Sequence, residues 1–264
     1  MTDWHTLARS RGRPLVMGIV NATPDSFSDG GKYLNPSDAL AHALEMVDLG
    51  ADIIDVGGES TRPGSQPVSI DDELDRVIPV VSELSSASDI PISIDTRHAE
   101  VAEAAIDAGA SIINDIMGLR GKGMMDVAVS SQVPAIVMFM HGTPETLATD
   151  TVEGDVLEVV RNFFEERIET ALDAGMHKNN IILDPGIGFG VTHQQSIQLL
   201  ENCTSLVRGY PVLVGASRKR FLAEMFPGMD REQASVEAVK VAAKAGADIV
   251  RVHDVAMTLD ALLD

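Results

Sequence analysis

The sequence has one cysteine and few basic residues, and each shortage excludes a class of protein. Cys203 is the only cysteine in 264 residues, so neither an intramolecular disulfide nor a multi-cysteine zinc site can form. Lysine and arginine number 20 against 40 acidic residues, giving a formal net charge of −20. This balance argues against a general nucleic-acid-binding or anionic-membrane surface, since both need a net basic potential.

Long apolar runs are also missing. No stretch reaches the roughly 18 apolar residues that a membrane-spanning helix needs. A basic stretch at 9–13 precedes an apolar run at 15–20, but that run is too short for the core of a signal peptide. We therefore expect a soluble protein of the reducing cytoplasm, with no membrane partner.

Short β-branched runs alternate with segments of helical periodicity along the whole chain. Several of the runs are continuously apolar, which is typical of strands buried on both faces of a parallel sheet. The predicted strands are 15–21, 52–56, 91–95, 111–115, 134–140, 181–184, 211–216 and 249–253. The predicted helices are 37–49, 71–84, 99–108, 151–174, 194–201 and 233–245.

Eight strand–helix units in about 250 residues, without a linker, favour a closed (β/α)8 TIM barrel of the α/β class. We predict a single domain over 1–264, with 1–14 as an N-terminal lead-in. The alternative is an open, doubly wound sheet, because periodicity alone does not show whether a sheet closes.

Polar residues end nearly every predicted strand, which is where chemistry collects in a barrel. They are Asn21, Asp55, Asp95, Thr96, Asn114, Asp115, Asp184, Ser217, Arg218, Lys219, Arg251 and His253, with Met138 among them. Any one of them could simply be a turn or helix-cap residue. The complete ring, with charges inside apolar strand ends, indicates a site.

Two long loops and one basic run add to this ring. The loops at 21–31 and 57–65 are rich in glycine, serine and proline, and they carry Phe27 and Arg62. The run 217–220 follows an apolar strand and contains three cations. Together with Arg62, Arg251 and His253 it predicts a local positive pole for an anionic substrate, such as a phosphate ester.

Several of these segments resemble the dihydropteroate synthase family. They are 17–31 (MGIVNATPDSFSDGG), 55–64 (DVGGESTRPG), 93–96, 114–115, 183–189 and 217–219, in order along nearly the whole chain. The resemblance implies a (β/α)8 barrel, a homodimer and a Mg²⁺ cofactor. The implied reaction joins a dihydropterin pyrophosphate to 4-aminobenzoate and releases pyrophosphate.

The resemblance also implies roles for individual residues. The pterin site would comprise Asp95, Asn114, Met138, Asp184 and Lys219. The pyrophosphate site would comprise Asn21, Thr61, Arg62, Arg251 and His253, with Asn21 also binding the metal. The 4-aminobenzoate site would comprise Phe27, Thr61, Arg62, Pro63, Phe189 and Lys219. Asp29, Arg62 and Lys219 would act in catalysis, and we expect the C–O bond to break largely before the amine attacks.

Some alternatives stay open at this point. The fifth strand reads Met138-Phe139-Met140-His141, so the pocket methionine is Met138 in one register and Met140 in a register shifted by two. A corrinoid-linked methyltransferase that binds methyltetrahydrofolate would share the acidic pterin site but would not need the diphosphate cations. A non-catalytic pterin-binding paralogue would be expected to lack Asn21, Arg62 or Lys219, and all three are present.

Overall fold

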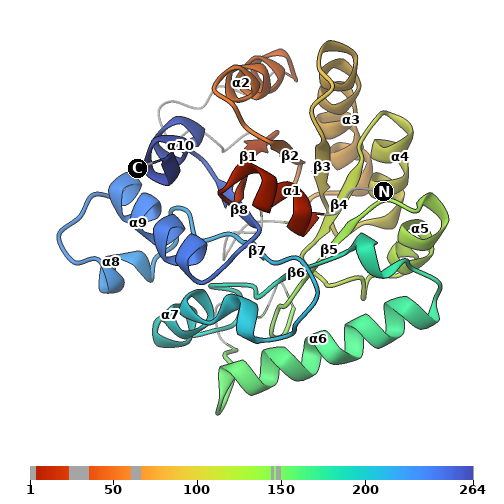
Figure 1. Cartoon of the computed structure of the whole chain (residues 1–264). Coiled ribbons are helices and arrows are strands. Elements are labelled where there is room, and N and C mark those ends of the chain that lie inside the picture. The colour runs from red at the N-terminus through yellow and green to blue at the C-terminus, as the bar shows by residue number, and fades with distance from the viewer. Residues whose placement is uncertain (1–3, 24–35, 61–66, 144–145, 147–149, 264) are drawn as a thin grey trace.

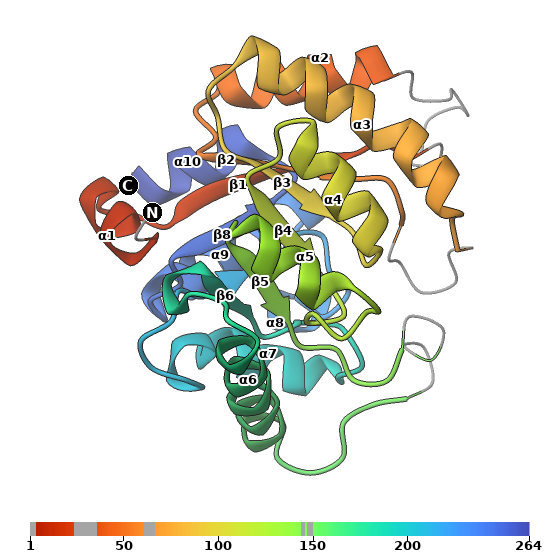
Figure 2. The same ribbon diagram turned by 90° about the vertical axis from the view of Figure 1, so that its right-hand side faces the viewer.

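A computed structural model of the chain describes residues 4–23, 36–60, 67–143, 146 and 150–263. Strands surround a common axis and helices cover them on the outside (Figures 1 and 2). The strands are β1 (Leu15–Asn21), β2 (Ile53–Gly57), β3 (Ile92–Asp95), β4 (Ile112–Asp115), β5 (Ala135–Met138), β6 (Ile181–Asp184), β7 (Leu213–Val214) and β8 (Ile249–Val252).

The sheet is an eight-stranded parallel barrel. Its order is β6-β5-β4-β3-β2-β1-β8-β7, and a parallel bridge between Leu183 and Val212 joins its two outer strands. The predicted (β/α)8 barrel is therefore confirmed. β7 is shorter than the predicted strand at 211–216; just before it, the Val212 N–H donates to Asp248 Oδ2 at 2.9 Å instead of to a neighbouring strand.

Apart from α1, which covers one end, the helices lie around the outside of the barrel. They are α1 (Trp4–Arg11), α2 (Pro36–Asp48), α3 (Ile70–Ala87), α4 (Ala99–Asp107), α5 (Met124–Ser131), α6 (Val156–Asp173), α7 (His193–Glu201), α8 (Leu222–Met225), α9 (Arg231–Lys244) and α10 (Val255–Leu263), with short 3₁₀ turns at Lys178–Asn180 and Cys203–Ser205. The helix predicted at 151–174 begins only at Val156, because Asp155 accepts a hydrogen bond from the Leu157 N–H at 2.9 Å and caps it.

Alternation along the strands determines which side chains enter the barrel. One buried apolar cluster fills its interior: Trp4, Ala8, Leu15, Met17, Ile53, Ile112, Ile136, Ile182, Leu213 and Ile249. Because successive side chains of a strand point to opposite faces, the residues two positions further along also face inward. On β2, β4, β5, β6 and β8 these are Asp55, Asn114, Met138, Asp184 and Arg251. The polar ring is thus the next interior layer, toward the carboxyl ends of the strands.

The opposite, amino-terminal end of the barrel is covered by α1. Trp4 is 3% exposed and Ala8 is 7% exposed, and both pack against the interior cluster. Figure 1 shows α1 lying across this end. The segment predicted as a lead-in therefore closes the barrel floor, and the carboxyl ends of the strands remain as the place for a site. Among the described residues, no helix combines the length and the apolar character needed to cross a membrane.

Candidate active site

The centre of the polar layer is an arginine held between two aspartates. Arg251 Nε donates to Asp55 Oδ2 at 2.6 Å, and Arg251 Nη2 donates to Asp95 Oδ2 at 2.6 Å. Burial alone would lower the pKa of Arg251, but Asp55 and Asp95 outweigh this effect and raise it. Asn114 Nδ2 donates to both oxygens of Asp55, at 3.3 and 3.2 Å. With its NH2 group turned toward Asp55, Asn114 can offer its amide oxygen to a ligand as an acceptor.

These acids are unusual because the barrel interior removes them from water. Asp55 is fully buried, and the side chain of Asp95 is 14% exposed. Burial raises the pKa of Asp95 to about 7, although Arg251 opposes the shift. Displaced pKa values of this kind are frequent at ligand-binding and catalytic sites.

A third acid of the layer, Asp184, lies near a lysine, Lys219. Burial raises the pKa of Asp184, and the charge of Lys219 opposes this shift. Burial lowers the pKa of Lys219 to about 8, while the charge of Asp184 opposes this shift. Lys219 Nζ donates to the carbonyl of Ile187 and lies 4.6 Å from the centre of the Phe189 ring. Lysine and aromatic ring thus form one wall of the site.

The turn after β6 can form only with glycine. Gly186 has a φ of +65°, and its N–H donates to Asp184 Oδ1 at 2.8 Å. A Cβ at Gly186 would lie 1.8 Å from the carbonyl oxygen of Phe139, an impossible contact. The motif at 183–189 is therefore needed to orient the Asp184 carboxylate.

The apolar wall of the site contains both candidate methionines. Met138 and Met140 belong to one buried cluster with Ile116, against which Phe189 packs. Met138 pairs with Asp184 in the β5–β6 ladder, so it lies in the same layer as the acids. His141 lies further out, with its Nε2 at 3.2 Å from Asp150 Oδ1, and so has a surface partner.

A serine and a histidine meet beside Arg251. Ser217 Oγ lies 3.0 Å from His253 Nδ1 and also accepts the His253 backbone N–H at 3.4 Å. Asn21 ends β1 and lies on the interior side by alternation from Met17. The described part of the predicted anion site therefore clusters at the same end of the barrel.

The prediction that the whole run 217–220 contributes its cations to the site is wrong for Arg218. Arg218 Nε lies 2.8 Å from Glu232 Oε1 on α9, away from the acidic layer. Arg220 is exposed. A turn with Arg218 at a φ of +60° directs Lys219 alone among the three cations toward Asp184. The backbone geometry of this turn therefore directs cations that are adjacent in the sequence to different places, and the composition of the run does not reveal this.

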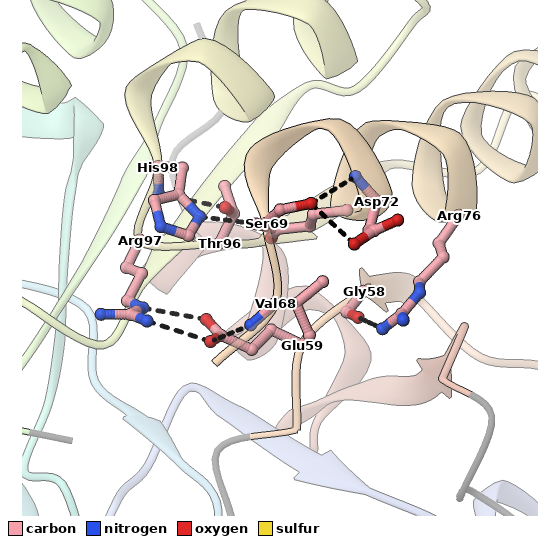
Figure 3. A network of polar contacts seen from close by, with 10 residues as sticks. Gly58, Glu59, Val68, Ser69, Asp72, Arg76, Thr96, Arg97 and His98 are labelled. Carbon is pink, nitrogen blue, oxygen red and sulfur yellow. Dashed lines mark hydrogen bonds and ion pairs between the residues drawn. The ribbon is translucent and has the colours of Figure 1, made fainter. Parts of the chain in front are cut away.

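The base of the β2–α3 loop is tied to the end of β3 (Figure 3). Arg97 donates two hydrogen bonds to Glu59, from Nε to Oε2 at 2.9 Å and from Nη2 to Oε1 at 3.0 Å. Glu59 Oε1 also accepts the N–H of Val68 at 3.2 Å, and His98 Nδ1 lies 2.6 Å from Oε2 of the buried Glu73. These bonds fix the two ends of the loop beside Asp95.

Five predicted site residues lie outside the described residues: Phe27, Asp29, Thr61, Arg62 and Pro63. Conversely, the layer contains one acid of the predicted polar ring to which the family resemblance gave no role, Asp55. Its position two residues after the interior Ile53 is the signal that would have identified it. Asp115 directly follows Asn114 on β4, so its side chain points to the opposite face of the sheet. Its carboxylate accepts hydrogen bonds from the N–H groups of Met117 and Leu119, both at 2.8 Å, and so stabilises a loop.

The arrangement is suited to a flat, hydrogen-bonding heterocycle with an anionic tail. Carboxylate and amide oxygens can accept from its N–H groups, Lys219 can donate, and the methionine–phenylalanine wall can cover its face. Arg251 and His253 provide donors for negative charge.

Comparisons with known proteins agree with this geometry. The model of the family described as "Pterin binding enzyme" matches residues 17–253. Dihydropteroate synthase of Bacillus subtilis is 45% identical over 264 residues, covering 96% of this chain and 90% of the relative. The Yersinia pestis enzyme, solved as a sulfonamide drug complex, is 42% identical with a TM-score of 0.89, covering 96% and 93% of the two chains.

The Xanthomonas albilineans enzyme has been solved with different ligands. Its structure with 4-aminobenzoic acid is 45% identical, with a TM-score of 0.88 and coverage of 95% and 91%. Its complex with 7,8-dihydropteroate gives 43% identity, a TM-score of 0.85 and coverage of 95% and 92%. Sequence and fold agree over nearly the whole chain, and the protein belongs to the pterin-binding enzyme family and, within it, to the dihydropteroate synthases.

Proposed function

We propose that this protein condenses 6-hydroxymethyl-7,8-dihydropterin pyrophosphate with 4-aminobenzoate, giving 7,8-dihydropteroate and pyrophosphate for folate biosynthesis. The observation that carries the proposal is the interior layer, where acids, an amide and a lysine lie together at the carboxyl end of the barrel strands. The activity is that of a transferase, and its substrates are small molecules.

The aminopyrimidinone edge of a pterin presents N–H donors beside a carbonyl acceptor. Asp95, Asp184 and the amide oxygen of Asn114 would accept from the donors, and Lys219 would donate to the acceptor side. Met138 would pack on the face of the ring. Hydrogen bonds to charged groups in such surroundings contribute about 1.5–3 kcal/mol each, so losing one carboxylate would strongly weaken binding. Asp55 would act by orienting Asn114 and Arg251.

The diphosphate tail would bind among Asn21, Thr61, Arg62, Arg251 and His253. Asn21 fits a Mg²⁺ site, because a neutral amide oxygen at the end of β1 is a hard ligand and Mg²⁺ is usually held by few protein atoms plus phosphate oxygens. The ion, when bound, would neutralise charge on the departing pyrophosphate. Arg251 would contribute a fixed cation at the boundary between pterin and diphosphate.

In the reaction, the C–O bond between the pterin methylene and the diphosphate breaks, and its electron pair leaves with pyrophosphate. The aniline nitrogen of 4-aminobenzoate then forms the C–N bond with its lone pair and loses a proton. We infer that bond breaking precedes attack, since the conjugated dihydropterin can delocalise the resulting positive charge. Asp29 would face this charge, with Arg62 and Lys219 acting beside it.

The 4-aminobenzoate site would combine Phe27, Thr61, Arg62 and Pro63 with Phe189 and Lys219. The contact between Lys219 and the Phe189 ring supports this proposal, since it pairs a cation for the carboxylate with an aromatic surface for the ring. We further propose that the enzyme is a homodimer in the cytoplasm. Light scattering on the purified protein would test its oligomeric state.

A turnover assay with a matched pair of buried aspartates tests the function. Asp184 and Asp248 each accept one backbone N–H, from Gly186 at 2.8 Å and Val212 at 2.9 Å, but they lie at opposite ends of the barrel. D184N should lower kcat/KM for the pterin substrate at least tenfold, whereas folded D248N should retain wild-type turnover. Absence of dihydropteroate formation by the wild-type protein, or full activity of D184N, would refute the proposal.

A further inference from the structure

Ser217 makes two hydrogen bonds to a single residue. Its Oγ lies 3.0 Å from His253 Nδ1, and the same oxygen accepts the His253 backbone N–H at 3.4 Å. Ser217 is 8% exposed, so water gives its hydroxyl little compensation. The serine therefore holds both the backbone and the ring of the histidine.

The directions of these bonds follow from the atoms involved. The backbone N–H can only donate, so Ser217 Oγ is its acceptor. Within the part of the chain that the structure describes, His253 Nδ1 is the acceptor within reach of the serine hydroxyl hydrogen. A buried hydroxyl that made no donation would be unfavourable. Nδ1 consequently accepts, and the proton of the neutral imidazole lies on Nε2, across the ring.

Hydrogen bonds from α9 hold the backbone next to Ser217 in a defined conformation. Arg218 adopts the left-handed region with a φ of +60°, which is strained for a residue with a side chain. Two residues of α9 hold it there: Ser235 Oγ accepts the Arg218 N–H at 2.9 Å, and Arg231 Nη2 donates to the Arg218 carbonyl at 2.9 Å. This turn sends Ser217 toward His253 and Lys219 toward Asp184.

We propose that Ser217 is a positioning residue that fixes His253 in the Nε2–H tautomer, so that the ring presents a hydrogen-bond donor to the diphosphate of the substrate. The inference rests on the proposed function, because that function places His253 in the diphosphate site. Ser217 acts through the histidine and does not itself need to touch the ligand. A fixed tautomer matters here because an imidazole nitrogen without a proton would face the anion with a lone pair.

The tautomer can be observed directly in the ligand-free protein. The ¹⁵N chemical shifts of histidine-labelled protein at about pH 9, above the ordinary imidazole pKa, distinguish protonated from unprotonated nitrogens. The wild type should show His253 protonated at Nε2 alone. S217A should show a mixture of both tautomers, whereas S217T, which keeps the hydroxyl, should restore the wild-type spectrum. S196A removes another buried serine hydroxyl, on α7, and serves as the control.

Binding and kinetics give the second readout. Titration with inorganic pyrophosphate and Mg²⁺ should show about tenfold weaker binding to S217A, equivalent to the loss of about one hydrogen bond, with S217T and S196A near the wild type. In turnover, KM for the pterin pyrophosphate should rise in S217A while KM for 4-aminobenzoate stays unchanged.

Two results would overturn the proposal. One is an unchanged His253 tautomer in S217A together with weaker pyrophosphate binding, which would mean that the serine contacts the anion itself. The other is a tautomer mixture in the wild type. Failure of the wild-type protein to make dihydropteroate would instead refute the proposed function, since the NMR result does not depend on turnover.

Discussion

Arg251 and Asp55 form an ion pair of 2.6 Å inside the barrel, between the last strand and the second. The same guanidinium group reaches Asp95 on β3, also at 2.6 Å. One cation thus neutralises two buried acids and lies where the pterin site would meet the diphosphate site. Arg251 and Asp95, which we propose to bind the substrate, therefore also help to hold the strand ends together.

Removal of Arg251 should therefore destabilise the fold. R251Q leaves the fully buried Asp55 carboxylate without its cation, and breaking such a pair costs about 3–5 kcal/mol. We expect about 3 kcal/mol, the lower end, because the Arg251 side chain is 22% exposed. Urea unfolding measures the change, and R220Q on the exposed surface is the control. A loss below about 1 kcal/mol would contradict the role of the pair.

Asp95→Asn should weaken pterin binding while the protein remains folded. Loss of one charged acceptor corresponds to about 10- to 100-fold in affinity, measured by calorimetric titration with a pterin. An unchanged affinity would remove Asp95 from the pterin site.

The same variant should alter the dependence of stability on pH. Burial raises the pKa of Asp95 to about 7 from its ordinary 3.8, so the folded state binds this proton more tightly than the unfolded chain does. Its contribution to stability is complete below pH 3.8 and is lost as the pH rises through 7. The free energy of unfolding of D95N minus that of the wild type should therefore increase from pH 4 to pH 7. A difference that stays constant or decreases would contradict the assignment.

The activity itself should have two limits in pH. Ionised Asp95 accepts from the pterin, so kcat/KM should rise as the pH passes about 7. Protonated Lys219 donates to it, so kcat/KM should fall as the pH passes about 8, where burial has placed the lysine pKa. K219Q should lose the alkaline limb and D95N the acidic one. A wild-type profile that is flat from pH 6 to 9 would show that neither group titrates as described.

Chelation of Mg²⁺ should separate the two halves of the substrate. EDTA should weaken binding of the pterin pyrophosphate by tenfold or more, yet leave binding of a pterin without phosphate unchanged. N21A should reduce this difference, because the variant removes the amide oxygen proposed as the protein ligand. Equal effects of EDTA on both ligands would refute the metal assignment.

The fold could be predicted from the sequence because strand burial on both faces gives a strong local signal. The apolar runs at 15–21 and 181–184 coincide with β1 and β6 in full. In contrast, α1, α5, α8 and α10 are not among the predicted helices; the first two have only eight residues each, and α8 has four. Their stability comes from packing on the barrel more than from their own pattern.

The site could be predicted only in part. The sequence indicates which residues lie at the ends of strands, but it does not directly show which of their side chains point into the barrel. Because side chains alternate between the two faces of a strand, counting from the interior isoleucines would have distinguished the interior Asp55 from the loop-stabilising Asp115. The left-handed turn at Arg218 could not be foreseen, because it depends on Ser235 and Arg231 from a later helix. Which cation of the run enters the site is therefore a tertiary property.

The central claim is that one barrel mouth binds the two ends of a single substrate through different residues, and a two-by-two affinity measurement tests it most directly. D184N and H253A would each be titrated with a pterin lacking phosphate and with the pterin pyrophosphate. D184N should weaken both ligands by a similar factor, whereas H253A should weaken only the pyrophosphate. Equal weakening of both ligands by H253A, or no effect of D184N on the phosphate-free pterin, would contradict the account.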